Sequence, residues 1–283
     1  MSGFYWIASY PKSGNTWVRL ALSALIHADT PSPSMNGSRF APNASRRSDI
    51  EDGLDVETGD LTPDEVRALR PAAYRALAQT SKHPLFRKVH DAWSATETEG
   101  PLFPPEATLG TIHIVRDPRD VAVSWAHFAA IDVDAAIAIL CDPSTIIRPH
   151  PPRVALTVPQ WLSCWSGHAR SWMDAPGRPG CLLRYEDLLA DPATALARIA
   201  TYAGIPHDET RIRNAIDATR FDALRRQEAE HGFNGGQAPG RAFFRAGRSG
   251  DWRHLLSDEQ VERICTTHRE MMQRLGYNES GCS

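Results

Sequence analysis

The sequence predicts an α/β protein in which helices flank a parallel β-sheet. Three apolar runs, at 4–9, 85–90 and 111–115, are separated by stretches whose apolar residues recur at helical spacing. Such alternation is typical of parallel sheets covered on both faces, which bind ligands at the carboxyl ends of their strands. The composition of 283 residues, 42% hydrophobic and 23% charged, is that of a globular protein. The length allows one large domain or two, and we expect one domain over 1–283.

Bulk charge and hydropathy exclude several classes of partner. A net charge of -3 and a pI of about 6.4 argue against nonspecific nucleic-acid binding and favour a small ligand held by a local basic cluster. No run approaches the roughly 20 apolar residues that a membrane span needs, and the first residues lack a signal-peptide pattern. We expect a cytoplasmic protein with neither membrane nor nucleic-acid partners. The oligomeric state stays open, with a homodimer as one option.

The order of the remaining elements follows from caps and periodicity. The first strand leads through a short loop to a helix over 16–27, and Thr62 caps a further helix with Pro63 in its first turn. A helix over 118–130 follows the strand at 111–115. The later expected elements are a helix at 159–173, a strand at 181–185, a helix from Asp191 and a final helix at 257–275.

Three regions are predicted to be irregular. An insertion at about 29–60 is rich in Ser, Pro, Asn and Asp, and a cap region at about 131–158 contains a proline-rich stretch. The third region is a Gly-rich loop at about 229–243. Because such loops shape pockets, we expect these regions to line a binding site.

The first chemical motif is Tyr10-Pro-Lys-Ser-Gly-Asn-Thr-Trp17, which lies between a strand and a helix. A turn of this kind directs backbone N–H groups and the positive end of a helix at one point, which suits a phosphate or sulfate, and Lys12 adds a full charge. It is not a Walker A loop, because the lysine precedes the glycine. A generic turn is the alternative.

This motif resembles the first signature of the sulfotransferases that use 3'-phosphoadenosine 5'-phosphosulfate (PAPS), and further resemblances follow in the family's order. They lie at Ile114-Val-Arg-Asp-Pro-Arg-Asp-Val-Ala-Val-Ser124, at Arg184-Tyr-Glu-Asp-Leu188, at Thr219-Arg-Phe221 and at Phe244-Arg-Ala-Gly-Arg-Ser-Gly-Asp-Trp252. The resemblance implies the P-loop NTPase-like sulfotransferase fold, with a P-loop-like phosphosulfate-binding loop. It also implies PAPS as co-substrate and a small-molecule hydroxyl as acceptor.

The resemblance assigns the donor site residue by residue. Arg116 and Ser124 correspond to the 3'-phosphate signature, and Trp17, Tyr185 and Phe221 to adenine contacts. Each of these aromatics alone is more typical of a core position, and only its place beside the two phosphate motifs favours a contact with the base. The implied cofactor-binding residues are Lys12, Ser13, Gly14, Asn15, Thr16, Trp17, Arg116, Ser124, Tyr185, Thr219, Phe221, Arg245, Ala246 and Gly247. Ala246 stands where the family usually has lysine, and the nearby Arg248 is a candidate replacement.

The catalytic residues are implied in the same way. Lys88-Val89-His90 resembles the family's K-T-H segment, so His90 is the expected general base, with Lys88, Lys12 and Ser124 as further catalytic residues. Of 31 basic residues only Lys12, Lys82 and Lys88 are lysines, which favours a role for a compact ammonium. No histidine pattern typical of metal ligation is present, so no metal is expected.

Two other classes of function stay open from the sequence. A nucleotide or nucleoside kinase also places a lysine-bearing loop after its first strand, and a catalytically silent nucleotide-binding protein would keep the loops. The start of the chain resembles bacterial small-molecule sulfotransferases, including those that modify natural products. This resemblance favours a phenolic or sugar hydroxyl of a secondary metabolite as the acceptor.

Overall fold

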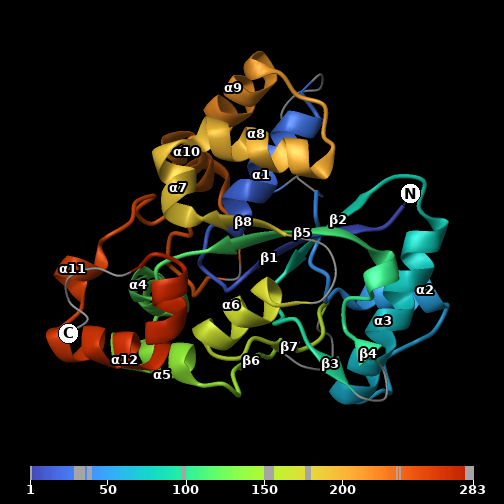
Figure 1. Cartoon of the computed structure of the whole chain (residues 1–283), viewed down its shortest axis with the longest axis horizontal. Helices are drawn as coiled ribbons and strands as arrows, with labels where there is room; N and C mark the ends of the chain where they lie inside the picture. Colours follow the sequence, from blue (N-terminus) through green and yellow to red (C-terminus); the bar gives the residue numbers. More distant parts are fainter. Residues whose placement is uncertain are drawn as a thin grey trace. The chain divides into compact units, whose positions relative to one another are not determined.

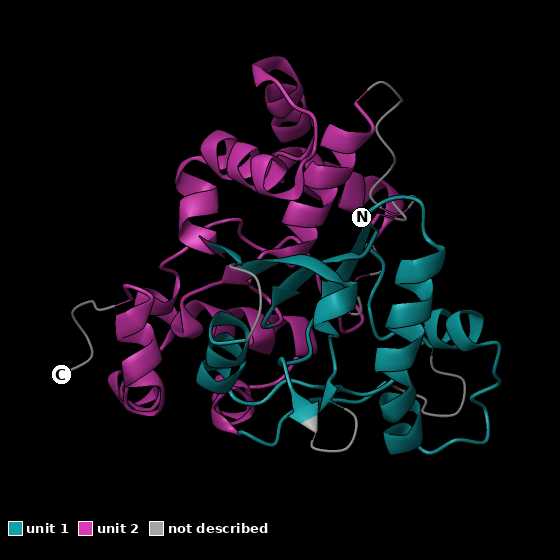
Figure 2. Cartoon of the chain, turned by 45° about the vertical axis from the view of Figure 1, so that its right-hand side comes forward, with its two compact units in different colours: residues 1–10, 41–113, 143–182 teal, residues 11–40, 114–142, 183–283 magenta. Residues whose placement is uncertain are grey.

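The computed structural model describes residues 2–28, 36, 40–96, 100–149, 156–175, 180–233, 235 and 237–277. The chain forms two compact units, each built from three stretches (Figure 2). Unit 1 comprises Met1–Tyr10, Ala41–His113 and Pro143–Leu182, and unit 2 comprises Pro11–Phe40, Ile114–Asp142 and Leu183–Ser283. The single domain expected over 1–283 stays a prediction. In the described part of the chain, no helix has the length and apolar character of a membrane span.

A parallel four-stranded sheet lies at the centre of the fold, in the order β2, β1, β5, β8 (Figure 1). These strands are β1 (Phe4–Ser9), β2 (Leu85–Val89), β5 (Thr108–Val115) and β8 (Cys181–Arg184). In the parallel pairing of β1 with β2, Ala8 lies opposite Val89. Helices flank the sheet, so the predicted α/β class is confirmed.

Unit 1 surrounds β1 and β2 with helices and an aromatic core. Its other elements are α2 (Arg47–Leu54), α3 (Pro63–Thr80), the 3₁₀ helix η1 (Pro105–Ala107), α6 (Trp165–Met173) and the two-residue strands β3 (Ala95–Thr96), β4 (Gly100–Pro101), β6 (Ile146–Ile147) and β7 (Gln160–Trp161). Phe4, Trp6, Tyr74, Phe103 and Trp172 form the core beside β1. Burial of such large rings supplies much of the stability of this unit.

Unit 2 consists mainly of helices. They are α1 (Asn15–Ile26), α4 (Pro118–Ala129), α5 (Val133–Cys141), α7 (Tyr185–Ala190), α8 (Pro192–Ala203), α9 (Glu209–Ala218), α10 (Phe221–His231), α11 (Trp252–Leu255) and α12 (Asp258–Arg274). Helix α1 packs against α8 and α9, while α4 packs against α5, α11 and α12. Ser257 caps α12 and exchanges hydrogen bonds with Gln260, as a capping box requires.

Several predicted boundaries were wrong. Helix α2 lies inside the insertion expected to be irregular at about 29–60, because Ile50 is buried against α3. Helix α5 occupies the start of the cap region at about 131–158, where Asp132 caps an apolar run. The helix expected from residue 159 begins only at Trp165, because Gln160 and Trp161 pair with β6.

Part of each region predicted to be irregular lies outside the described residues. These parts are 29–35 and 37–39 of the insertion, 150–155 of the cap region, and 234 and 236 of the Gly-rich loop. The Gly-rich loop also begins later than expected, because α10 extends to His231.

Candidate active site

The loop after β1 is built to receive an anion. Helix α1 begins without a side-chain cap and without an acidic residue in its first turn, and its N-cap residue Gly14 has φ 99°. The Ser13 hydroxyl is buried and has no hydrogen-bond partner in the described part of the chain. Lys12, with φ 70°, lies in the same turn. First-turn N–H groups, a hydroxyl and a cation therefore gather in one loop.

Arg116 ties this loop to a second segment. It is 6% exposed and follows β5. Its Nη1 donates to the Lys12 carbonyl at 3.0 Å, and its Nη2 donates to the Arg248 carbonyl at 3.1 Å. The guanidinium lies 4.3 Å from the centre of the Tyr185 ring. The planar fork thus fixes two backbone segments and leaves a cationic group beside both of them.

Tyr185 is the reason why glycine is required at position 14. A Cβ atom on Gly14 would lie 2.7 Å from Cδ2 of Tyr185, and the φ of 99° is itself unfavourable for other residues. Tyr185 therefore contacts the loop and Arg116. Its expected contact with adenine stays a prediction.

Ser124 lies on the face of α4 that contacts the loop after β1 and the segment 250–252. Asp120 and Phe128 are four residues before and after it, so the three side chains share one face. Asp120 accepts hydrogen bonds from the backbone N–H groups of Gly250, at 2.6 Å, and Trp252, at 3.2 Å. Phe128 lies 4.0 Å from Lys12 Nζ. Ser124 is thus placed between these two contacts.

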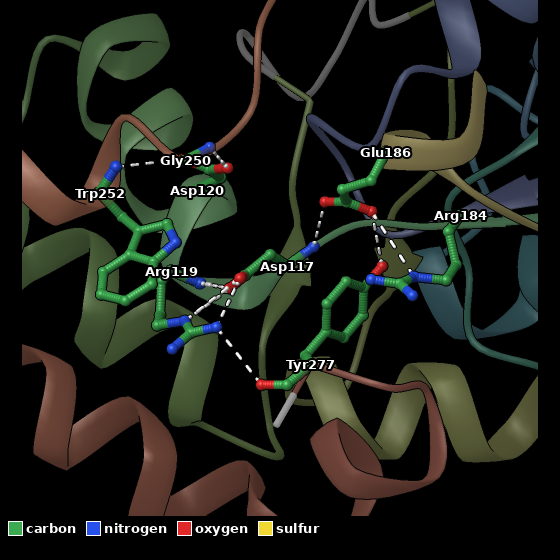
Figure 3. Close-up of polar contacts among 8 residues, drawn as sticks. All are labelled: Asp117, Arg119, Asp120, Arg184, Glu186, Gly250, Trp252 and Tyr277. Atoms are coloured by element: carbon green, nitrogen blue, oxygen red, sulfur yellow. Dashed lines mark hydrogen bonds and ion pairs between the residues drawn. The ribbon is translucent and has the colours of Figure 1, made fainter. Parts of the chain in front are cut away.

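The residues between Arg116 and Ser124 form a polar network that sequence reasoning did not predict (Figure 3). Arg119 donates from Nε and Nη2 to the two carboxylate oxygens of Asp117, at 2.9 and 2.7 Å. It also donates to the carbonyl of Tyr277 at 3.3 Å and lies 3.8 Å from the Trp252 ring. Both charges are buried, so this pair anchors the start of α4 rather than lying at the surface.

Glu186 completes the network from α7. It accepts hydrogen bonds from the backbone N–H of Asp117 at 3.1 Å and from the Tyr277 hydroxyl at 2.9 Å (Figure 3). Burial raises the pKa values of Glu186 and Asp120, although backbone hydrogen bonds oppose the shift in both. Sequence reasoning predicted no role for either carboxylate, although both lie inside motifs that match the family.

The segment after α10 brings two more arginines to the site. Asp251 accepts from Arg245 Nη2 at 2.7 Å and from Arg248 Nε at 2.5 Å. Burial alone would raise the pKa of Asp251, but the hydrogen bonds from Arg248 and Arg245 outweigh it, so the pKa is lowered. Gly247 has φ 62°, and a Cβ atom there would lie 2.4 Å from the Phe221 ring. The segment can therefore turn here only with glycine.

Two of the predicted adenine contacts, Trp17 and Phe221, lie together in unit 2. Trp17 Nε1 donates to the Thr219 carbonyl at 3.0 Å, and the Thr219 hydroxyl donates to the Ala215 carbonyl at 2.7 Å. Trp17 and Phe221 belong to one apolar cluster with Leu224. Both aromatics are only partly buried, so they can also present a ring to a base.

His90 and Lys88 belong to unit 1. His90 follows β2, and its Nδ1 lies 2.8 Å from the Ser9 carbonyl. Because a carbonyl oxygen only accepts, Nδ1 must carry the proton, and Nε2 is the basic atom of the neutral ring. The next residue, Asp91, is buried and receives both Nη groups of Arg70, at 2.9 and 2.7 Å. The backbone that carries His90 is therefore held firmly.

The predicted site residues thus fall into two groups, one in each unit. Every predicted cofactor-binding residue lies in unit 2, whereas His90 and Lys88 lie in unit 1. Lys88 is part of β2, opposite Ile7 of β1. Among the residues that the structure describes, no group of three or more His, Cys, Asp or Glu side chains is placed to hold a metal ion.

Comparison with known proteins shows the family of this chain. The chain belongs to the sulfotransferase family, because the model of the sulfotransferase domain matches residues 4–276. Cytosolic sulfotransferase 10 of Arabidopsis thaliana is 22% identical over 275 residues, which cover 91% of this chain and 74% of that protein. Flavonol 3-sulfotransferase of Flaveria bidentis is 22% identical over 290 residues, which cover 91% of this chain and 78% of that protein.

Solved structures share the fold. The crystal structure of retinol dehydratase in complex with androsterone and the inactive cofactor PAP has a TM-score of 0.62 at 22% identity, covering 95% of this chain and 80% of that chain. Mouse sulfotransferase SULT7A1 complexed with PAP has a TM-score of 0.59 at 17% identity, covering 98% and 85%. The predicted sulfotransferase fold is thereby confirmed.

Proposed function

We propose that this chain transfers the sulfuryl group of PAPS to a hydroxyl of a small-molecule acceptor, releasing a sulfate ester and 3'-phosphoadenosine 5'-phosphate (PAP). The observation that carries the proposal is the loop after β1, where the uncapped start of α1 meets Lys12 and the Ser13 hydroxyl, which has no hydrogen-bond partner among the described residues. An anionic oxygen is the natural partner for such a set of donors.

PAPS fits the remaining residues of unit 2. Lys12, Ser13 and the first N–H groups of α1 would hold the 5'-phosphosulfate. Arg116 is tied by hydrogen bonds to the backbone of Lys12 and Arg248, so a cation lies between the two segments that the two phosphate groups would contact. Ser124 and Arg245 would complete the 3'-phosphate site, with the adenine against Trp17 and Phe221. The PAP-bound neighbours support this choice of donor.

The transfer needs little more than a base and a cation. His90 Nε2 would take the proton of the acceptor hydroxyl as its oxygen bonds to sulfur, and the bond from sulfur to the phosphate oxygen would break. Lys12 and the loop N–H groups would stabilise the charge that develops on that oxygen. The hydrogen bond from Nδ1 to Ser9 supports this role, because it aligns the ring and sets the tautomer.

The acceptor is a phenolic or sugar hydroxyl of a secondary metabolite in this proposal. Support comes from the relative named for flavonol and from neighbours crystallised with androsterone or retinol, all of which carry hydroxyl groups. A cytoplasmic location is part of the proposal, supported by relatives named cytosolic sulfotransferases. The kinase alternative is less well supported, because the lysine precedes the glycine in the loop.

Two measurements test the proposal. Calorimetric titration should show tight binding of PAP, with ATP and ADP binding at least about tenfold more weakly, whether or not Mg²⁺ is added. Incubation with PAPS and a panel of phenols and sugars should then yield a product heavier by SO₃ in mass spectrometry. Binding of ATP in preference to PAP would refute the proposal and favour the kinase alternative.

A further inference from the structure

The ammonium group of Lys12 lies between two aromatic rings of unit 2. Its Nζ is 4.0 Å from the centre of the Phe128 ring and 4.4 Å from that of Phe243. The two rings meet edge to face, 6.2 Å apart at 81°. A cation within about 6 Å of a ring centre is attracted by the negative face of the ring. Both rings fall within this range.

Hydrogen bonds to backbone atoms hold the two segments that carry these rings. The segment 237–244 is held against the end of α4, because Ala238 N–H donates to the Phe128 carbonyl at 2.9 Å and His127 Nε2 contacts the Ala242 carbonyl at 3.1 Å. Glu228 of α10 accepts from the N–H group of Phe243 at 2.5 Å. Phe243 is therefore held by contacts from two helices.

The backbone of Lys12, from which the side chain extends, is also fixed. The Lys12 backbone has φ 70°, and its carbonyl accepts the hydrogen bond from Arg116. A left-handed conformation is costly for a residue with a side chain and persists only where surrounding contacts impose it. The aromatic rings thus hold the charged end of a side chain whose origin is already fixed.

We propose that Phe128 and Phe243 are positioning residues that hold the Lys12 ammonium in place before the donor binds. The segment 237–244 thereby sets the position of the lysine, because it carries one of the two rings. The consequence for sulfuryl transfer depends on the proposed function, whereas the restraint on Lys12 is a property of the protein without ligand.

The two rings suit a cation that must later change partner. A lysine stem is flexible, and fixing it before the donor arrives removes disorder that would otherwise have to be lost on binding. A contact with a neutral ring is weaker than one with a phosphate oxygen, so the arriving phosphosulfate can draw the ammonium away.

Lysine acylation measures this restraint directly. The chain has only three lysines, so competitive acetylation followed by peptide mass spectrometry can report Lys12 relative to Lys82, which is exposed. In the protein without ligand, Phe243→Leu should increase the relative labelling rate of Lys12 by about three- to tenfold, because loss of a ring favours the neutral, accessible amine. Phe128→Leu should act in the same direction.

Matched variants separate the restraint from general loosening. Phe243→Tyr keeps the ring face and should leave Lys12 labelling within about twofold of the wild type. Phe233 packs on Phe243 with ring centres 4.8 Å apart in the same apolar cluster. Phe233→Leu should lower thermal stability about as much as Phe243→Leu does while leaving Lys12 labelling unchanged. Equal labelling changes in Phe233→Leu and Phe243→Leu would overturn the proposal, as would no change in Phe243→Leu.

The same assay with PAP distinguishes this proposal from the proposed function. Saturating PAP should protect Lys12 in the wild type and reduce the difference from Phe243→Leu, because the phosphate then holds the ammonium. If PAP neither binds nor protects Lys12, the donor assignment fails, while the comparison of ligand-free variants still decides the role of the rings.

Discussion

Replacement of Arg116 should impair both the loop after β1 and recognition of the 3'-phosphate. In Arg116→Ala two hydrogen bonds from a charged donor are lost, leaving the carbonyls of Lys12 and Arg248 without them. Each such bond contributes about 1.5–3 kcal/mol. We therefore expect the free energy of unfolding to fall by about 3 kcal/mol or more. PAP affinity should fall by at least about tenfold, and AMP affinity should also fall because the loop proposed to hold the 5'-phosphate loses its support.

Arg116→Lys separates the two roles, because it keeps the positive charge but cannot bridge two carbonyls with a planar fork. AMP affinity should fall in this variant too. Arg245→Ala is the matched control: its described hydrogen bond goes to the side chain of Asp251, so its loss should weaken PAP and spare AMP. Calorimetric titration with both nucleotides and urea unfolding measure these effects. Unchanged AMP affinity and stability in Arg116→Ala would refute the reasoning.

Further predictions concern single residues. His90→Ala should lower turnover about 10²–10⁴-fold with PAP affinity intact, and a change under tenfold would remove its role as base. Gly14→Ala should abolish PAP binding in titrations, since the new Cβ atom meets Tyr185. Arg248→Ala should weaken PAP less than Arg245→Ala, because the Arg248 side chain is 72% exposed; equal losses would contradict this. Burial lowers the pKa of His113 to about 3. Below pH about 6.5 the unfolded chain therefore binds a proton at His113 that the folded chain does not bind. Stability is lost as pH falls from there, by about 2 kcal/mol at pH 5, and urea unfolding of His113→Leu should lack this loss.

The sequence predicted those elements of the fold whose signals are local. The strands beside the loop and the helix capped at Thr62 follow from apolar runs and cap chemistry, and the structure confirms them. Helix α9 was missed because only Ile212 and Ala215 are buried in it, which is too few for a clear periodic pattern. Its stability depends on packing against α1 and α8, which no short window of sequence reveals.

The candidate site was predicted from motifs rather than from contacts. The resemblance pointed to Arg116 as a phosphate ligand, but its bonds to the backbone of Lys12 and Arg248 join residues more than one hundred positions apart in the chain. The same is true of Asp120, whose partners are Gly250 and Trp252. Contacts of this range depend on tertiary structure, so periodicity and spacing cannot reveal them.

The division of the chain into interleaved stretches has a consequence for protein dissection. The chain passes between unit 1 and unit 2 at residues 10, 40, 113, 142 and 182, so no truncation from either end isolates unit 2 as a whole. A single proteolytic cut between residues 11 and 182 would yield two fragments that each contain parts of both units. Exchange of the donor site with that of a relative would require three simultaneous segment replacements, and a circularly permuted chain would still interleave the two units.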